Sequence, residues 1–441
     1  LKTRAIEGWN KFSGHTPHKP WIDEIKIRCE NCGELMTRIP DVGNPWLDAG
    51  IVPFSTPIDP KLPGGRFGRK VSYLSDKKYW SEWFPFDFVT ESFPGQFKNW
   101  FYSLLTMSTV LKDRAPFKTV LGFASLLGED GRPMHKSWGN SIEFNEAADK
   151  IGADVMRWLY AKQDPARNLM FGYKVADEVR RNFHLPLWNI YNFFVTYANF
   201  DNWTPKKSTT NKLPIASNIL DKWIIARLKQ ATNTTTESLD NYDGAPATRA
   251  IEGFVNDFST WYIRRSRDRV GPTADKIGDK KQFYETSYFV LVTLMKIIAP
   301  FVPFLAETIY LGLTKADSVH LTDWPDLPQL EKREEMIIEN MAIIRRAAEA
   351  GRAARKTMSI KVRQPLTRAL ISAPEKAPTK PFLDVLADEL NVKEISWKRK
   401  RVEEPQVVLQ TKLTSSLVEE GKTRDLVREI QELRRKHGLG L

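Results

Sequence analysis

A polar stretch around residue 136 combines the residue types that can act on a phosphate group. The sequence GRPMHKSWGN, residues 131–140, holds glycines, the flexible Lys136 and the hydroxyl of Ser137 just before an expected helix. An ammonium group and backbone N–H donors on a mobile loop can stabilise negative charge that develops on a phosphate. Composition alone also allows an ordinary turn before a helix. The stretch is therefore a candidate phosphate site, with a solvated surface lysine as the alternative.

Two cysteines, Cys29 and Cys32, form a C-x-x-C turn that is followed by Gly33. Glycine lets such a turn fold two thiolates onto one zinc ion, whereas a structural zinc site needs four ligands. His15 and His18 lie nearby but match no usual ligand spacing. The turn predicts half of a structural zinc site, and the alternative is a reduced turn without metal.

A cluster of arginines follows residue 260, at Arg264, Arg265, Arg267 and Arg269. Beside Trp261 and Tyr262 these side chains could offer phosphate contacts and a stacking surface for unpaired RNA bases. Two alternatives stay open. Charge clusters are often solvated faces, and some of these arginines could hold helices together through carboxylates such as Asp257 and Asp268.

The whole chain is basic, since 66 Lys and Arg oppose 54 Asp and Glu among 441 residues, a net charge of +12. Such an excess favours a polyanionic partner, with nucleic acid ahead of an acidic membrane surface. Apolar residues at 41% and charged residues at 27% are globular proportions, which exclude a disordered or fibrous protein. Two cysteines exclude a disulfide framework and favour a reducing compartment. No apolar run reaches the roughly 20 residues of a membrane span.

The elements that must position these residues are of two kinds. Short apolar runs broken by Gly, Pro and Asp predict strands and loops over residues 1–60, and a helix is expected at 96–111. Alternating strands and helices favour an α/β layer there. Further on, apolar residues recur four apart and predict helix, at Ala147, Ile151, Val155 and Leu159.

Helices continue through the second half of the chain. Ser217 is the expected N-cap of a helix that carries Leu220 and Ile224, and two more helices are expected at 245–268 and 280–298. Together they predict a helical bundle. The last part of the chain predicts a small α+β domain, from a helix at 332–357 to a basic helix at 422–437.

Seven segments resemble, in order, the motifs of the class I aminoacyl-tRNA synthetases. MHKSWGN at 134–140 is similar to the K-M-S-K-S-x-G-N loop, and WLDAG at 46–50 is similar to the W-F-D-S-G segment. Glu91, Gln96 and WFY at 100–102 resemble the E-G-x-D-Q-x-R-G-W-F-Y adenylate-binding segment. The match extends through DKWI at 221–224, WYIRRSRDR at 261–269, IAPF at 298–301 and SVHLTDWP at 318–325. Within the class, IKVRQPL at 360–366 fits the isoleucyl branch best.

The resemblance implies a reaction and a set of site residues. Isoleucine would react with ATP, accompanied by Mg, to give an adenylate, and the acyl group would then pass to tRNA(Ile). The resemblance assigns the phosphate-stabilising loop to Met134, His135, Lys136 and Ser137. It assigns substrate binding to Trp46, Asp48, Glu91, Gln96 and Trp100. It assigns tRNA binding to Trp261, Arg264, Arg265, Arg267, Arg269, Lys361 and Arg363. Trp46 and Trp100 would line the isoleucine pocket, unless both are core tryptophans.

The implied fold is a partial Rossmann-like α/β catalytic domain, a helical anticodon-binding bundle and a small α+β C-terminal domain. We expect four parts, at residues 1–130, 131–205, 206–330 and 331–441. We also expect the chain to be a C-terminal fragment that lacks the H-x-G-H half, the editing domain and a second cysteine pair. Alone it would then be inactive. The whole protein is expected to be a cytoplasmic monomer.

The sequence departs from the family pattern at several positions. Pro133 and His135 replace the first Lys and the first Ser of the loop, Gly95 stands where the adenylate segment has Asp, and Asn44 stands where an Asp is usual. Either Glu91 takes over the contact to the amino group, or that contact is weaker. These departures leave a second hypothesis, a synthetase-like RNA-binding protein without catalysis. A third is a valyl- or leucyl-tRNA synthetase.

Overall fold

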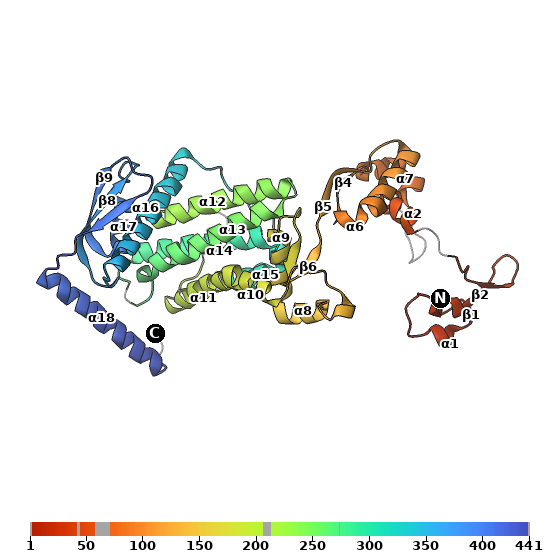
Figure 1. The fold of residues 1–441 in the computed structure, drawn as a ribbon, viewed down its shortest axis with the longest axis horizontal. Coiled ribbons are helices and arrows are strands. Elements are labelled where there is room, and N and C mark those ends of the chain that lie inside the picture. Colours follow the sequence, from red (N-terminus) through yellow and green to blue (C-terminus); the bar gives the residue numbers. More distant parts are fainter. Residues whose placement is uncertain (1, 42–44, 58–70, 206–212, 273, 440–441) are drawn as a thin grey trace. The chain divides into compact units, whose positions relative to one another are not determined.

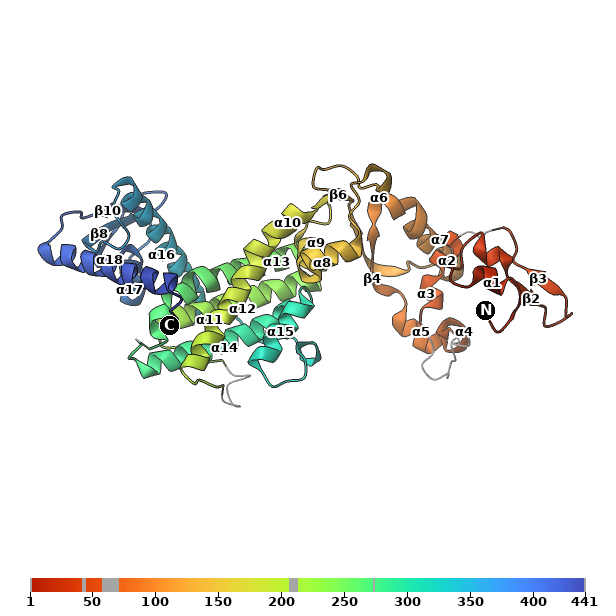
Figure 2. The same cartoon turned by 90° about the horizontal axis from the view of Figure 1, so that it is seen from below.

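The computed structural model describes residues 2–41, 45–57, 71–205, 213–272 and 274–439. The chain divides into two compact units, of which the first comprises Leu1–Ser125 with Pro165–Asn168 and the second comprises Leu126–Asp164 with Leu169–Leu441. Figures 1 and 2 show their elements from two directions. The predicted boundaries at 130, 205 and 330 remain predictions, and Asn44 lies outside the described residues.

The first unit begins with a small antiparallel sheet of three strands in the order β1-β2-β3. These strands are β1 (Ala5–Glu7), β2 (Lys26–Arg28) and β3 (Leu35–Thr37), accompanied by α1 (Trp9–Phe12) and η1 (Trp21–Glu24). Gly8 has φ +80°, and a Cβ atom at Gly8 would lie 1.7 Å from the carbonyl oxygen of Glu24. Only glycine allows this close approach of the two chain segments.

The remainder of the first unit is the predicted α/β layer, and its class is confirmed. Strands β4 (Phe86–Ser92) and β5 (Phe117–Phe123) are parallel. Parallel strands need a crossover connection, and it consists of α6 (Phe93–Gln96), η2 (Phe97–Phe101) and α7 (Tyr102–Lys112). Four short helices precede β4, namely α2 (Pro45–Gly50), α3 (Val52–Ser55), α4 (Ser72–Ser75) and α5 (Lys77–Trp83). Gly50 lets α2 lie against α7, since a Cβ atom there would lie 2.7 Å from the carbonyl oxygen of Ser103.

The second unit opens with a pair of short parallel strands and five helical segments. These are β6 (Leu126–Gly128), β7 (Leu169–Phe171), α8 (Phe144–Ile151), α9 (Ala153–Lys162), α10 (Tyr173–Val179), η4 (Arg180–His184) and α11 (Leu185–Phe200). The apolar face predicted from Ala147 to Leu159 is buried. A single helix through this face is wrong, however, because Gly152 has φ +95° and separates α8 from α9.

The predicted helical bundle follows and is confirmed (Figure 1), with α12 and α13 packed side by side. Its elements are α12 (Ile219–Asp240), α13 (Gly244–Asp257), η5 (Phe258–Ile263), η6 (Arg267–Arg269), α14 (Ile277–Ile298), α15 (Pro303–Leu313) and η7 (Val319–Leu321). The N-cap prediction at Ser217 is wrong by one residue. Asn218 accepts the Leu220 N–H at 2.9 Å, whereas the Ser217 hydroxyl donates to the Gln282 side chain at 2.7 Å.

The predicted α+β end domain is also confirmed. It contains α16 (Lys332–Thr357), β8 (Leu366–Ala373), α17 (Lys380–Leu390), β9 (Val392–Arg399), β10 (Gln406–Leu409) and α18 (Ser415–Lys436), and the strands form the sheet β10-β8-β9. Helix α16 has the predicted bounds because Glu331 and Glu334 form a capping box. Helix α18 begins at Ser415 rather than 422, after the Thr414 cap. Among the described residues, no helix is both long and apolar enough to cross a bilayer.

Candidate functional site

The loop that carries Lys136 starts as a tight turn at the end of β6. The Gly128 N–H donates to the Arg132 carbonyl at 2.9 Å, and Leu127 pairs with Pro133 as an antiparallel bridge. The turn requires Gly131, whose φ is +75°. The Asp130 carboxylate accepts the Arg132 backbone N–H at 3.0 Å, and this bond together with the Arg132 guanidinium lowers the pKa of Asp130.

Asn140 closes the same loop from its other end. Its side-chain amide donates to the Pro133 carbonyl at 2.9 Å, and its side-chain oxygen accepts the His135 N–H at 2.9 Å. Between these bonds the chain makes the 3-10 turn Lys136–Trp138, which ends at Gly139 with φ +70°. The sequence identified Asn140 only as a motif letter. The position of Asn140 directly after Gly139 was the one feature of the sequence that pointed to these two hydrogen bonds.

The structure brings the four predicted loop residues together on this turn. Lys136 is exposed, and its ammonium group makes no hydrogen bond or ion pair with any other described residue. The His135 ring meets the Trp138 ring edge to face, with centroids 4.3 Å apart. Ser137 is exposed and Met134 is half-buried. The clamped turn therefore presents an ammonium group whose charge is available to an anion.

A second anchor of the loop was not found from the sequence. The Glu129 carboxylate, one residue after β6, accepts the backbone N–H groups of Lys174 and Val175 at the start of α10, the latter at 3.1 Å. A Cβ atom at Gly172 would lie 2.0 Å from the Glu129 side chain. Glycine at 172 is therefore needed for this contact, which ties the stem of the loop to α10.

The predicted substrate residues belong to the first unit. Trp100 in η2 lines a cavity of about 210 Å³ whose other walls, apart from Thr90, are apolar side chains such as Phe86 and Leu104. Its indole N–H donates to the Ala49 carbonyl in α2 at 3.1 Å. Trp46 lies on the same helix α2 but is not among the residues that line this cavity. The structure thus gives Trp100 an apolar pocket that suits an aliphatic side chain.

The polar members of this set are Glu91 and Gln96, at and just after the end of β4, and Asp48 on α2. Glu91 accepts the Ser92 N–H at 2.7 Å, and Asp48 is exposed on α2. The side-chain oxygen of Gln96 is buried and has no hydrogen-bond partner among the described residues. A buried acceptor without a partner costs about 1–3 kcal/mol. A ligand that donates a hydrogen bond to Gln96 would remove this cost.

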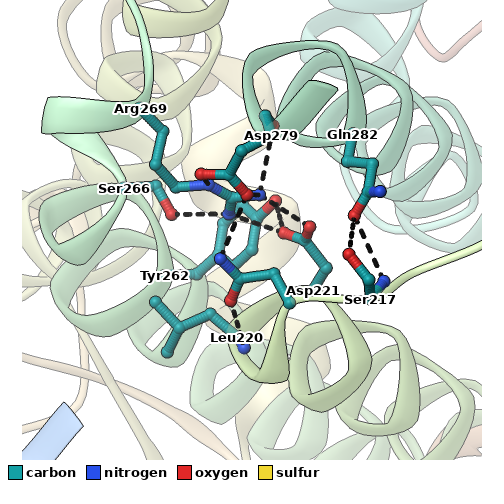
Figure 3. A network of polar contacts seen from close by, with 9 residues as sticks. Ser217, Leu220, Asp221, Tyr262, Ser266, Arg269, Asp279 and Gln282 are labelled. Carbon is teal, nitrogen blue, oxygen red and sulfur yellow. Dashed lines mark hydrogen bonds and ion pairs between the residues drawn. The ribbon is translucent and has the colours of Figure 1, made fainter. Parts of the chain in front are cut away.

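Arg269 has a different role from the one expected (Figure 3). Its guanidinium donates to both oxygens of Asp221 at 2.7 Å and to Asp279 at 2.8 and 2.9 Å, while the Tyr262 hydroxyl donates to Asp221 at 2.7 Å. Asp221 is fully buried. Burial acts to lower the pKa of Arg269, but the contacts with Asp221 outweigh it and raise that pKa. Burial, followed by the Asp221 charge, raises the pKa of Tyr262. Arg269 therefore holds α12, η5 and α14 together.

The other members of the arginine cluster are divided between internal contacts and solvent. Arg264 and Arg265 pair with Glu389 of α17, at 2.8 and 3.3 Å. Arg267 is exposed and has no ion pair among the described residues. Trp261 is only 6% exposed, so the expected stacking surface is absent from this ring. The expected bundle carboxylate Asp257 pairs with arginines outside the cluster, Arg227 and Arg345.

Lys361 and Arg363 lie on the loop before β8 and share one carboxylate. Asp425 of α18 lies 3.4 Å from the Lys361 ammonium and 2.8 Å from the Arg363 guanidinium. The hydrogen bond from Arg363 lowers the pKa of Asp425. Since the Lys361 side chain is 71% exposed, its charge still faces solvent.

The C-x-x-C segment folds as a tight turn that Gly33 closes. Gly33, with φ +79°, donates its N–H to the Cys29 carbonyl at 3.0 Å. Backbone hydrogen bonds from Cys32 and then Asn31 lower the pKa of the Cys29 thiol, which favours the thiolate that binds metal. No group of three or more His, Cys, Asp or Glu ligands exists among the described residues. The two cysteines therefore fit half of a zinc site.

Two family models match successive parts of the chain. Residues 6–171 match the family model for tRNA synthetases class I (I, L, M and V), and residues 221–371 match the model for the anticodon-binding domain of tRNA ligase. The isoleucine–tRNA ligase of Dehalococcoides mccartyi is 35% identical over 449 aligned positions, which cover 96% of this chain and 42% of that protein.

One further relative and one solved structure complete the comparison. An isoleucine–tRNA ligase of Bacillus thuringiensis is 35% identical, over 85% of this chain and 35% of its own. A crystal structure of LeuRS from Agrobacterium radiobacter with tRNA and LeuAMS is 18% identical, has a TM-score of 0.48, and covers 70% of this chain and 36% of its own. The chain thus spans about two fifths of the curated relatives it matches, 42% of the first.

Proposed function

Because the chain belongs to the class I tRNA synthetases of the I, L, M and V group, we propose that it is part of an isoleucine–tRNA ligase. The observation that carries the proposal is the Lys136 ammonium, which has no partner within the described part of the chain, on a turn clamped by Asn140. In this role the complete protein joins isoleucine to tRNA(Ile) through an adenylate. The chain alone is expected not to aminoacylate.

The proposed first step is attack of the isoleucine carboxylate on the α-phosphorus of ATP. The new O–P bond forms as the bond to pyrophosphate breaks, so negative charge grows on the leaving phosphates. Lys136, with the Mg that accompanies ATP, would stabilise this charge. Removing one preorganised stabilising group of this kind costs about 3–4 kcal/mol of transition-state energy.

The cavity beside Trp100 supports the proposed amino-acid substrate. Its walls are mostly apolar, and its volume of about 210 Å³ leaves room for a branched aliphatic side chain. We assign the buried side-chain oxygen of Gln96, four positions before Trp100, to a donor on the adenylate, because it lacks any other partner among the described residues. Trp46, Asp48 and Glu91 keep their proposed roles in substrate binding.

The proposed macromolecular partner is tRNA(Ile), bound through the bundle and the end domain. Arg264, Arg267, Lys361 and Arg363 keep charge toward solvent and are the proposed phosphate contacts. Cys29 and Cys32 would hold a structural zinc ion together with ligands from elsewhere in the complete protein. We propose that this protein is a cytoplasmic monomer.

A second candidate function is supported by three departures from the family motifs. Pro133, His135 and Gly95 replace residues that the family motifs use, which favours a synthetase-like RNA-binding protein without catalysis. A third candidate is a tRNA ligase that uses valine or leucine in place of isoleucine.

Pyrophosphate exchange by the complete protein separates these candidates. We expect labelled pyrophosphate to enter ATP when isoleucine is present, and much less when valine or leucine replaces it. Exchange with valine or leucine alone would overturn the isoleucine assignment. Absence of exchange with all three amino acids, from a folded protein that binds tRNA, would favour the non-catalytic candidate.

A further inference from the structure

Five arginines on three elements are anchored by two buried carboxylates at the boundary between the bundle and the end domain. The first carboxylate is Glu389 of α17, whose side chain is 3% exposed. Arg264 donates to both of its oxygens at 2.8 Å, Arg265 donates at 3.3 Å, and Arg352 of α16 forms a third ion pair with it. A single negative charge thus holds three guanidinium groups in fixed positions.

The second carboxylate is Asp257 at the end of α13, whose side chain is 5% exposed. Arg227 of α12 donates to it at 2.8 Å and Arg345 of α16 at 2.6 Å. The two anchored groups meet at the Trp261 ring, because the guanidinium carbons of Arg264 and Arg345 lie 5.8 and 5.4 Å from its centroid. We call these five arginines the arginine platform.

The platform keeps an excess of positive charge that faces solvent. Its five positive charges oppose Glu389, Asp257 and the exposed Asp388 that pairs with Arg265, which leaves an excess of two. The side chains of Arg264 and Arg352 are each 42% exposed. A guanidinium has five N–H donors in a rigid fork, so an arginine held by one carboxylate has donors left for another anion.

We propose that the arginine platform binds backbone phosphates of tRNA, with Arg352 and Arg345 as contacts that the sequence motifs do not identify. This inference rests on the proposed function, since it takes tRNA as the partner. The buried carboxylates fix the guanidinium groups before RNA arrives, so little side-chain entropy is lost on binding. Phosphate contacts position RNA without reading its sequence. The platform is therefore expected to contribute equally to cognate and unrelated tRNA.

The test is the salt dependence of tRNA binding by the 441-residue chain, followed by fluorescence anisotropy. Arg352→Gln removes the charge but keeps an amide that can donate to Glu389, so the fold should be retained, as a thermal melt would verify. We expect the slope of log K against log salt to fall by about one, with affinity reduced roughly three- to tenfold for both tRNA(Ile) and an unrelated tRNA. Arg352→Lys, which keeps the charge, is expected to keep most of the slope.

Arg346→Gln is the matched control, because Arg346 lies on the same helix, is 43% exposed and pairs instead with Glu375. It should leave the slope unchanged. An unchanged slope in Arg352→Gln, or a loss confined to tRNA(Ile), would overturn the platform while leaving the tRNA partner in place. Failure of the wild-type chain to bind any tRNA would overturn both the platform and the proposed partner.

Discussion

Lys136 and Arg269 are both cations in segments that resemble family motifs, yet their surroundings differ completely. Lys136 lies on an exposed turn with no ion pair to any described residue. Arg269 is 9% exposed and donates to two carboxylates, one of them fully buried. The presence of a cation in a family motif therefore does not show whether it binds a ligand or holds helices together. The exposure of the cation and the number of carboxylates that occupy its donors make that distinction.

The largest expected effect on folding comes from removing Arg269. Arg269→Ala would leave Asp221 buried without its ion pair, and breaking a buried pair in this way costs about 3–5 kcal/mol. Urea unfolding of the chain measures the loss. Arg267→Ala is the matched control, because Arg267 lies in the same short helix, is exposed and has no ion pair among the described residues. Equal stability losses in both variants would contradict the structural role of Arg269.

His184 sharpens the comparison, because it is a buried titratable side chain whose two ring nitrogens lack partners among the described residues. Burial is the largest cause that lowers the pKa of His184, from 6.5 to about 4, and the charge of Arg180 adds to it, against a smaller opposing effect of the Val179 backbone. As pH falls, His184 therefore takes up a proton in the unfolded chain at a higher pH than in the folded chain. The resulting stability is present above pH 6.5 and is lost between pH 6.5 and 4, by up to about 3 kcal/mol.

Unfolding of His184→Leu across this pH range tests the assignment. The difference in unfolding free energy between wild type and variant should shift by up to about 3 kcal/mol in favour of the variant as pH falls from 6.5 to 4. A constant difference would show that the ring is not held neutral by burial.

A smaller effect is expected from the loop clamp. Asn140→Ala removes both amide hydrogen bonds across the Lys136 turn, each with a net worth of about 0.5–1.5 kcal/mol. We expect roughly a tenfold fall in isoleucine activation by the complete protein, and a fall in its unfolding free energy of no more than about 1–3 kcal/mol, the sum of the two hydrogen bonds. Asn145→Ala is the control, since within the described ranges the Asn145 side chain donates to the exposed Glu143 alone. Full activity of Asn140→Ala would remove the clamp from the mechanism.

The parts of the fold that depend on local signals could be predicted from the sequence. Helix α16 matches its predicted bounds because its cap residues, Glu331 and Glu334, are three positions apart. The burial of the face from Ala147 to Leu159 followed from spacing alone. The break at Gly152 did not, since a glycine within an apolar pattern can also lie inside a helix.

The ion pairs of Arg269 and the second anchor of the Lys136 loop could not be predicted, because their partners lie far away along the chain. Asp221 is 48 positions from Arg269, and the Glu129 anchor joins residues 45 positions apart. Spacing within a motif carries no information about such pairs. The sequence therefore identified Lys136 and Arg269 alike as functional cations, and only the three-dimensional structure distinguishes them.

The most direct test of the account is the rate of isoleucine activation by the complete protein carrying Lys136→Ala, with its unfolding free energy measured in parallel. The account predicts that activation slows by about 10²–10³-fold, while the unfolding free energy changes by no more than about 0.5 kcal/mol, as for other exposed side chains. An unchanged rate, or a fall in rate matched by loss of the fold, would contradict it.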